Sequence, residues 1–132
     1  MSISRFPLGS KSQSPYYGKT ILVVDDSEIS RVMLKTMIEA ISGSLDVYEA
    51  KDGLEAIKMV EQHKPDLITL DEEMPGKNGL ETVPELLKIN PESRIVLITA
   101  HGEENVKEKV KALSIEYLAK PITEAKVINL LS

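Results

Sequence analysis

Acidic side chains follow two short apolar runs of the chain, and their type and spacing could do chemistry. Ile21–Val24 leads directly into Asp25 and Asp26, and Leu67–Leu70 leads directly into Asp71. Short runs of branched aliphatic residues are typical of strands buried on both faces of a parallel sheet. If the two strands are neighbours, three carboxylates meet beyond their carboxyl ends. Because like charges at close range repel, we expect something cationic to be bound there.

Strand-like runs alternate with helical patterns along the rest of the chain. We predict five strands, at Thr20–Val24, Asp46–Ala50, Leu67–Leu70, Arg94–Thr99 and Glu116–Ala119. Apolar residues at helical spacing follow each run. In the first helix these residues are Ile29, Val32, Met33, Met37, Ala40 and Ile41. Asp52 and Asn78 each precede a glutamate by three residues, as in helix capping boxes. The alternation predicts an α/β fold, with a parallel sheet covered by helices on both faces.

The composition limits the class of protein. A chain of 132 residues with 42% hydrophobic and 28% charged residues fits one ordinary globular domain. The net charge of −5 argues against direct binding of nucleic acid, which needs a basic patch. The absence of cysteine excludes disulfides and thiolate chemistry. No apolar stretch approaches the ~18 residues of a membrane helix, and no secretory signal is recognisable. We therefore expect a cytoplasmic protein without membrane insertion.

The first residues differ in composition from the rest. Residues 1–18 are rich in Ser, Pro, Gly and Lys and show no apolar period. We predict a flexible N-terminal tail at 1–18 and a folded domain at 19–132. The alternative is an ordered arm in which Tyr16 and Tyr17 pack onto the domain.

Short motifs at four of the five predicted strand ends resemble the receiver domain of bacterial response regulators, in particular its stand-alone chemotaxis type. They are Asp25-Asp26-Ser27, the segment from Asp71 to Gly79, Thr99-Ala100 and Lys120-Pro121. The resemblance covers about residues 19–131. It implies a flavodoxin-like, doubly wound sheet of five parallel strands in the order 2-1-3-4-5, with five helices.

The resemblance also implies a phosphorylation site with a bound metal ion. Asp71 would accept a phosphoryl group and form an acyl phosphate. Asp25, Asp26, Asp71 and the backbone carbonyl of Glu73 would hold Mg²⁺, which prefers oxygen ligands and clamps phosphoryl oxygens.

Further residues would complete the implied switch. The Thr99 hydroxyl and the Lys120 ammonium would contact the transferring phosphoryl group. Thr99 would then be drawn toward that group while Tyr117 rotates inward, which changes the surface of the last strand and its two flanking helices. Pro121 resembles the family's cis proline.

Three residues near the implied site set this chain apart or could tune it. Glu72 stands where the family often has an apolar residue, and it adds an acid. Glu73 and His101 occupy positions that, in the family that this chain resembles, flank the phosphoryl group and tune its hydrolysis. We hypothesise that Glu73 slows attack through its charge and that His101 acts near its usual pKa of ~6.5.

Each residue taken alone has an ordinary structural explanation. Asp25 and Asp26 could cap the following helix, and Thr99 and Tyr117 suit a strand. Lys120 could be a solvated lysine at a strand end. Complementary residues at four strand ends make the phosphorylation site the better interpretation.

We therefore predict a signalling switch that catalyses only its own phosphorylation and dephosphorylation. The expected donor is a sensor histidine kinase or a phosphotransfer protein, and the expected target is another protein. The chain would act alone, as a monomer or a phosphorylation-induced dimer. Two alternatives stay open: a Mg²⁺-dependent phosphatase on a similar fold, and a pseudo-receiver that binds partners without phosphate. An enzyme or carrier of phosphate-containing cofactors is disfavoured, because no Gly-rich loop follows the first strand.

Overall fold

One parallel sheet organises the computed structural model, which describes residues 15–74, 78–100 and 104–132. In these residues the strand order is β2-β1-β3-β4-β5. The strands are β1 (Thr20–Val24), β2 (Asp46–Ala50), β3 (Leu67–Asp71), β4 (Arg94–Thr99) and β5 (Glu116–Ala119). The helices are α1 (Glu28–Ser42), α2 (Gly53–His63), α3 (Gly79–Ile89), α4 (Glu104–Ala112) and α5 (Glu124–Leu130). The predicted fold class and strand order are confirmed, and β3 extends by one residue to include Asp71.

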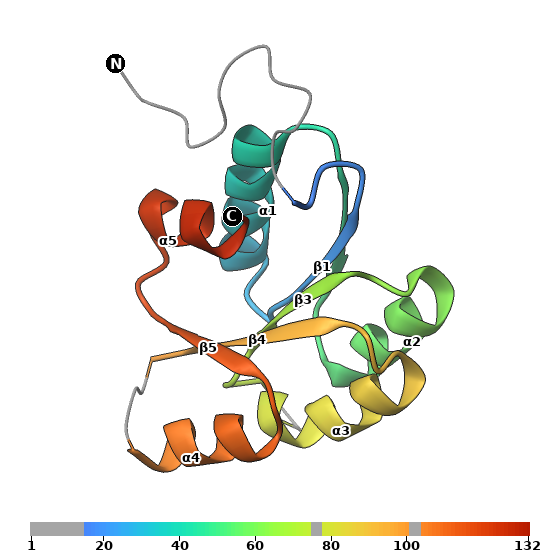
Figure 1. Cartoon of the computed structure of the whole chain (residues 1–132), viewed down its shortest axis with the longest axis vertical. Coiled ribbons are helices and arrows are strands. Elements are labelled where there is room, and N and C mark those ends of the chain that lie inside the picture. The colour runs from blue at the N-terminus through green and yellow to red at the C-terminus, as the bar shows by residue number, and fades with distance from the viewer. Residues whose placement is uncertain (1–14, 75–77, 101–103) are drawn as a thin grey trace.

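Helices cover both faces of the sheet (Figure 1). α1 and α5 lie on one face, and α2, α3 and α4 lie on the other. Successive strand side chains point to opposite faces, so Ile21 and Val23 pack under α1 and α5 while Leu22 and Val24 pack under α2 and α3. Because both faces are buried, the central strands need nearly unbroken apolar sequences.

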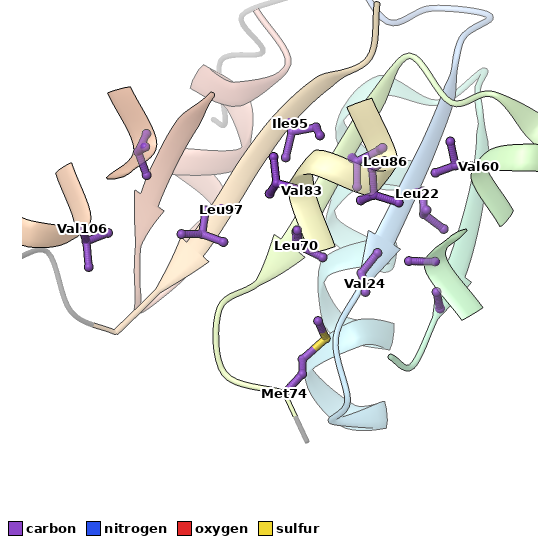
Figure 2. Packing of buried hydrophobic residues seen from close by; sticks show 14 residues of the cluster. Leu22, Val24, Val60, Leu70, Met74, Val83, Leu86, Ile95, Leu97 and Val106 are labelled. Atoms are coloured by element: carbon purple, nitrogen blue, oxygen red, sulfur yellow. The ribbon is translucent and has the colours of Figure 1, made fainter. Parts of the chain in front are cut away.

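The core under α2, α3 and α4 continues to the edge of the sheet where the acidic residues lie. Leu22 and Leu70 pack with Leu86 of α3 at its centre (Figure 2). Met74, in the segment that follows β3, packs into the same cluster and is 8% exposed. The chain leaving β3 is therefore anchored by an apolar side chain three residues beyond Asp71.

Helix α1 is present as predicted, but its buried side is rotated from the apolar positions that marked it. Leu34 and Ile38 are buried, whereas Ile29 is 75% and Met33 is 55% exposed. The helix carries two overlapping apolar stripes, because adjacent helical positions differ by about 100°. Packing against the sheet selects the stripe through Leu34, which leaves Ile29, Val32 and Met33 in solvent.

The residues that lead into β1 contact the opposite edge of the sheet from the acids. The Arg94 guanidinium donates to the Tyr16 hydroxyl (3.0 Å) and to the Leu130 carbonyl at the end of α5 (2.7 Å). It also binds both carboxylate oxygens of Glu116, which lowers the pKa of that carboxyl. Tyr16 thus packs onto the domain. Residues 1–14 lie outside the described residues, and the division at 18/19 stays a prediction.

Helix α3 begins very close to the backbone at the end of β3. The predicted capping box is present, because the Asn78 side chain accepts from the Glu81 N–H and the Asn78 N–H donates to the Glu81 carboxylate. Immediately afterwards, a Cβ on Gly79 would lie 2.5 Å from the Asp71 carbonyl oxygen. Only glycine allows this approach, which packs the start of α3 against the backbone of Asp71.

We expect Gly79→Ala to lower the free energy of unfolding by roughly 1–3 kcal/mol, because the added methyl group overlaps backbone that cannot rotate away. Gly53→Ala is the matched control, since its Cβ would meet a Thr82 side-chain hydroxyl at 2.8 Å. The added methyl group there meets a single side-chain hydroxyl, which is bonded to the Asn78 carbonyl, rather than the backbone, so we expect a smaller loss. Urea unfolding followed by circular dichroism measures both, and equal losses would contradict the argument.

Candidate functional site

Three carboxylates meet at the carboxyl edge of the sheet. Asp25 and Asp26 follow β1, Asp71 ends β3, and these two strands are neighbours in parallel register. One carboxylate oxygen from each acid lies within 4.8 Å of the other two. The convergence inferred from the apolar runs is therefore observed.

Asp71 is the buried member of this group, and its side chain is 7% exposed. Its Oδ1 lies 3.2 Å from the Lys120 ammonium and accepts a long hydrogen bond (3.4 Å) from the Glu73 N–H. Lys120 follows β5, and its own N–H donates to the Thr99 carbonyl. The peptide bond between Lys120 and Pro121 is cis, as predicted. The sheet thus delivers a cation from β5 to a carboxylate on β3.

Hydrogen bonds hold the loop that carries Asp25. The Ser27 N–H donates to the Asp25 carboxylate (2.9 Å), and the Arg31 guanidinium donates to the Asp25 carbonyl (2.8 Å). Arg31 also binds the Glu49 carboxylate on β2 at 2.9 Å. Arg31 was not predicted as part of the site. Its partner Glu49 lies on β2, and sequence patterns do not show which acid an arginine contacts across the fold.

The charge at this edge is not balanced by the protein alone. Burial raises the pKa of the Asp25 carboxyl above its ordinary value, and the nearby Asp71 charge raises it further. The hydrogen bond from Ser27 and the Lys120 charge act in the opposite direction without cancelling the rise. Clustered oxygen ligands with excess negative charge suit a hard divalent cation such as Mg²⁺. The donor set therefore fits the predicted metal ion.

Thr99 contacts Glu72, a pairing that the sequence did not predict. Its side chain is fully buried at the end of β4, and its hydroxyl donates to the carboxylate of Glu72. The sequence showed only that Glu72 adds a charge next to Asp71. A contact between side chains that are 27 positions apart depends on the β3–β4 register and on rotamers, which sequence patterns do not carry.

The remaining predicted residues lie around this centre. Tyr117 pairs with Leu97 in the sheet and is half-buried against the core. Glu73 is exposed beside Asp71. His101 lies outside the described residues.

An apolar cavity of about 560 Å³ opens beside the acids, between α1 and the segment after β5. Its walls include Met33, Leu34 and Ile98, and Asp25 and Lys120 lie on its lining. The site therefore borders an apolar recess as well as charged groups.

Residues 21–132 match the family model of the response regulator receiver domain. The chain belongs to this family. The match begins at the second residue of β1 and includes all the other strands and helices of the described residues. The chain is a receiver domain of the chemotaxis-regulator type and belongs to two-component signalling. None of the described helices has the length and apolar character needed to cross a membrane.

Similar proteins include short chemotaxis regulators and larger regulators. The chemotaxis protein CheY of Thermotoga maritima is 35% identical over 116 residues, which cover 87% of this chain and 96% of that protein. A protein-glutamate methylesterase/protein-glutamine glutaminase of Pyrococcus abyssi is 41% identical over 76% of this chain, which corresponds to 28% of that enzyme. The receiver fold thus occurs in similar proteins both alone and as part of an enzyme.

Solved structures agree with the fold. CheY4 of Vibrio cholerae has a TM-score of 0.79 at 26% identity, with 86% of this chain and 96% of that one covered. The response regulator domain of Thermotoga maritima CheB has a TM-score of 0.73 at 32% identity, with coverage of 86% and 90%. These similarities support the flavodoxin-like arrangement of the receiver domain.

We expect Asp25→Asn to stabilise the metal-free protein at pH 7. The folded state holds the Asp25 proton more tightly than the unfolded chain does, so this group lowers stability as the pH rises from 3.8 through the raised pKa. Asparagine removes the charge and keeps an oxygen that can accept from Ser27. Urea unfolding in chelator from pH 4 to pH 7 should show the variant more stable at pH 7 and a smaller difference near pH 4. A wild type that is as stable as the variant at pH 7 would contradict this.

Proposed function

We propose that this receiver domain is a phosphorylation-dependent signalling switch and that Asp71 is its phosphoacceptor. The observation that carries the proposal is the setting of Asp71. Its buried carboxylate is held 3.2 Å from the Lys120 ammonium and within 4.8 Å of the Asp25 and Asp26 carboxylates. A nucleophilic carboxylate among cation ligands suits the transfer of a phosphoryl group.

Mg²⁺ would be held by the carboxylates of Asp26 and Asp71 and the backbone carbonyl of Glu73, with Asp25 acting through a coordinated water. The bound ion supplies positive charge that neutralises phosphoryl oxygens during transfer. The raised pKa of Asp25 supports this assignment, because burial and, to a smaller extent, the Asp71 charge disfavour its ionised form, which a bound cation would favour.

The protein's own groups would carry the transfer. An Asp71 carboxylate oxygen attacks phosphorus in line and forms the P–O bond of an acyl phosphate. The P–N bond to the imidazole of a donor phosphohistidine breaks, and the imidazole leaves with the electron pair. Lys120 stabilises charge on the phosphoryl oxygens, and the Thr99 hydroxyl donates to one of them.

The donor would be a sensor histidine kinase or a phosphotransfer protein that reaches Asp71 from the side of α1. Two features support contact there. Ile29, Val32 and Met33 are exposed apolar residues on α1, and Met33 lines the cavity that borders Asp25 and Lys120. Exposed apolar side chains grouped beside a reactive centre are typical of a protein-binding surface.

The readout would use α4, β5 and α5. Movement of Thr99 toward the phosphoryl group would be accompanied by rotation of Tyr117 between β5 and α4, where the ring is half-buried. The described part of α4 presents exposed charges at Lys107, Glu108 and Lys109 to a protein target. We further propose a switch of the chemotaxis or phosphorelay type that acts alone, as a monomer or a phosphorylation-induced dimer. The 35% identity to the Thermotoga maritima CheY supports the chemotaxis type.

Incubation with Mg²⁺ and a small acyl phosphate should add one phosphoryl group, because the Asp71 carboxylate can attack the activated phosphorus directly. Intact mass spectrometry measures the gain. Asp71→Asn should gain nothing, since the amide is a poor nucleophile, and chelation of Mg²⁺ should abolish the gain in the wild type.

The other outcomes separate the alternatives. A phosphoryl group gained by Asp71→Asn would place the acceptor elsewhere. No gain in the wild type would favour an interaction module that is not phosphorylated. Release of phosphate over many turnovers would favour a phosphatase.

Loss of the charge at Glu73 should shorten the life of the phosphorylated protein. We expect Glu73→Ala to hydrolyse roughly two- to fivefold faster, because the negative charge of an exposed carboxylate repels an approaching hydroxide ion. His101→Ala should remove any change in the hydrolysis rate around pH ~6.5. Phosphate release after removal of the acyl phosphate measures both, and unchanged rates in both variants would reject the tuning hypothesis.

A further inference from the structure

The hydrogen bond between Thr99 and Glu72 is not explained by phosphoryl transfer itself. The Thr99 hydroxyl donates a hydrogen bond to the Glu72 carboxylate, yet the same hydroxyl is the group that would bind the phosphoryl oxygen on Asp71. A threonine hydroxyl carries one proton and donates it to one acceptor at a time. The Glu72 carboxylate and the phosphoryl group therefore compete for a single donor.

The backbone of Glu72 is fixed, so the contact is built into the end of β3. The Glu72 N–H donates to the Ile98 carbonyl (2.9 Å), and its carbonyl accepts from the Gly79 N–H (3.0 Å). A Cβ on Gly79 would lie 3.1 Å from the Glu72 Cα, which shows how closely the start of α3 packs there. The Glu72 carboxylate can leave Thr99 only by rotation of its side chain.

Charge favours that departure when Asp71 is modified. A phosphoryl group adds negative charge on the residue directly before Glu72, and like charges at this range repel. Glu72 is half-exposed, so its carboxylate can turn into water. The phosphoryl group would take the Thr99 hydroxyl that Glu72 gives up.

We propose that Glu72 is a positioning residue that holds the Thr99 hydroxyl in the unphosphorylated protein and releases it when Asp71 is phosphorylated. The proposal has two halves. The release half, that phosphorylation frees the hydroxyl, rests on the proposed function, whereas the holding half, that Glu72 binds the hydroxyl at rest, rests on the hydrogen bond alone. In the unphosphorylated protein the Thr99 hydroxyl is hydrogen-bonded to Glu72. A phosphoryl group can attract the hydroxyl only if it replaces this hydrogen bond.

The test compares two uncharged replacements of similar size. Glu72→Gln keeps an oxygen that can accept from Thr99, and Glu72→Leu has none, so the difference between them reports the hydrogen bond without the charge. The probe is beryllofluoride with Mg²⁺, a tetrahedral and non-covalent mimic of the phosphoryl group. Its dissociation constant is measured by NMR titration.

We expect Glu72→Leu to bind beryllofluoride about threefold to tenfold more tightly than Glu72→Gln, the factor that corresponds to one neutral hydrogen bond. Combined with Thr99→Val, the two replacements should bind equally, because no hydroxyl remains to be held. Equal affinities in the presence of Thr99 would overturn the proposal. A difference that persists with Thr99→Val would also overturn it, because the effect would then not pass through the hydroxyl.

A second measurement separates this proposal from the proposed function. Without Mg²⁺ or beryllofluoride, the hydroxyl proton of Thr99 should resonate downfield in the wild type and move upfield in Glu72→Leu. If the wild type binds no beryllofluoride, the proposed function and the release half fail together, and this resonance decides the holding half. A resonance unchanged in Glu72→Leu would refute the holding half too.

Discussion

The pairing of β1 with β3 forces acidic groups together, and the arrangement of the site follows from that constraint. Val24 lies opposite Leu70, so the residues that continue these strands share one edge of the sheet. The apolar strands are held by burial on both faces, and they do not move apart to relieve repulsion between the carboxylates that follow them. Lys120, which follows β5, holds the Asp71 carboxylate, and Arg31 of α1 holds the loop of Asp25 through its carbonyl.

The strands and the acidic cluster could be predicted because they depend on local sequence. A run such as Ile21–Val24 has no polar position for solvent, so it predicts a strand covered on both sides. Parallel strands then bring their carboxyl ends to one edge, which made the meeting of Asp25 and Asp71 foreseeable. The order of the strands came from the resemblance to receiver domains, since five alternating units are compatible with several orders.

The buried side of α1 and the partner of Thr99 could not be predicted in the same way. The apolar positions of α1 form two stripes, and only the packed sheet decides that Leu34 is buried while Ile29 is exposed. The Glu72 rotamer depends on where β4 ends relative to β3 and on the close start of α3 at Gly79. Arg94 is similar, because its contacts with Tyr16 and Leu130 join residues that are far apart in the chain.

The Arg94 contacts have a mechanical consequence for the molecule. Arg94 begins β4 and Glu116 begins β5, and their ion pair ties these two strands together at the edge far from the acids. The same guanidinium holds the last turn of α5 through the Leu130 carbonyl. These contacts restrain the amino ends of β4 and β5, whereas Thr99 ends β4 and Lys120 follows β5 at the opposite edge. We therefore expect any displacement at the acidic edge to be greatest in the segments that leave that edge toward α4 and α5, and smallest at Arg94.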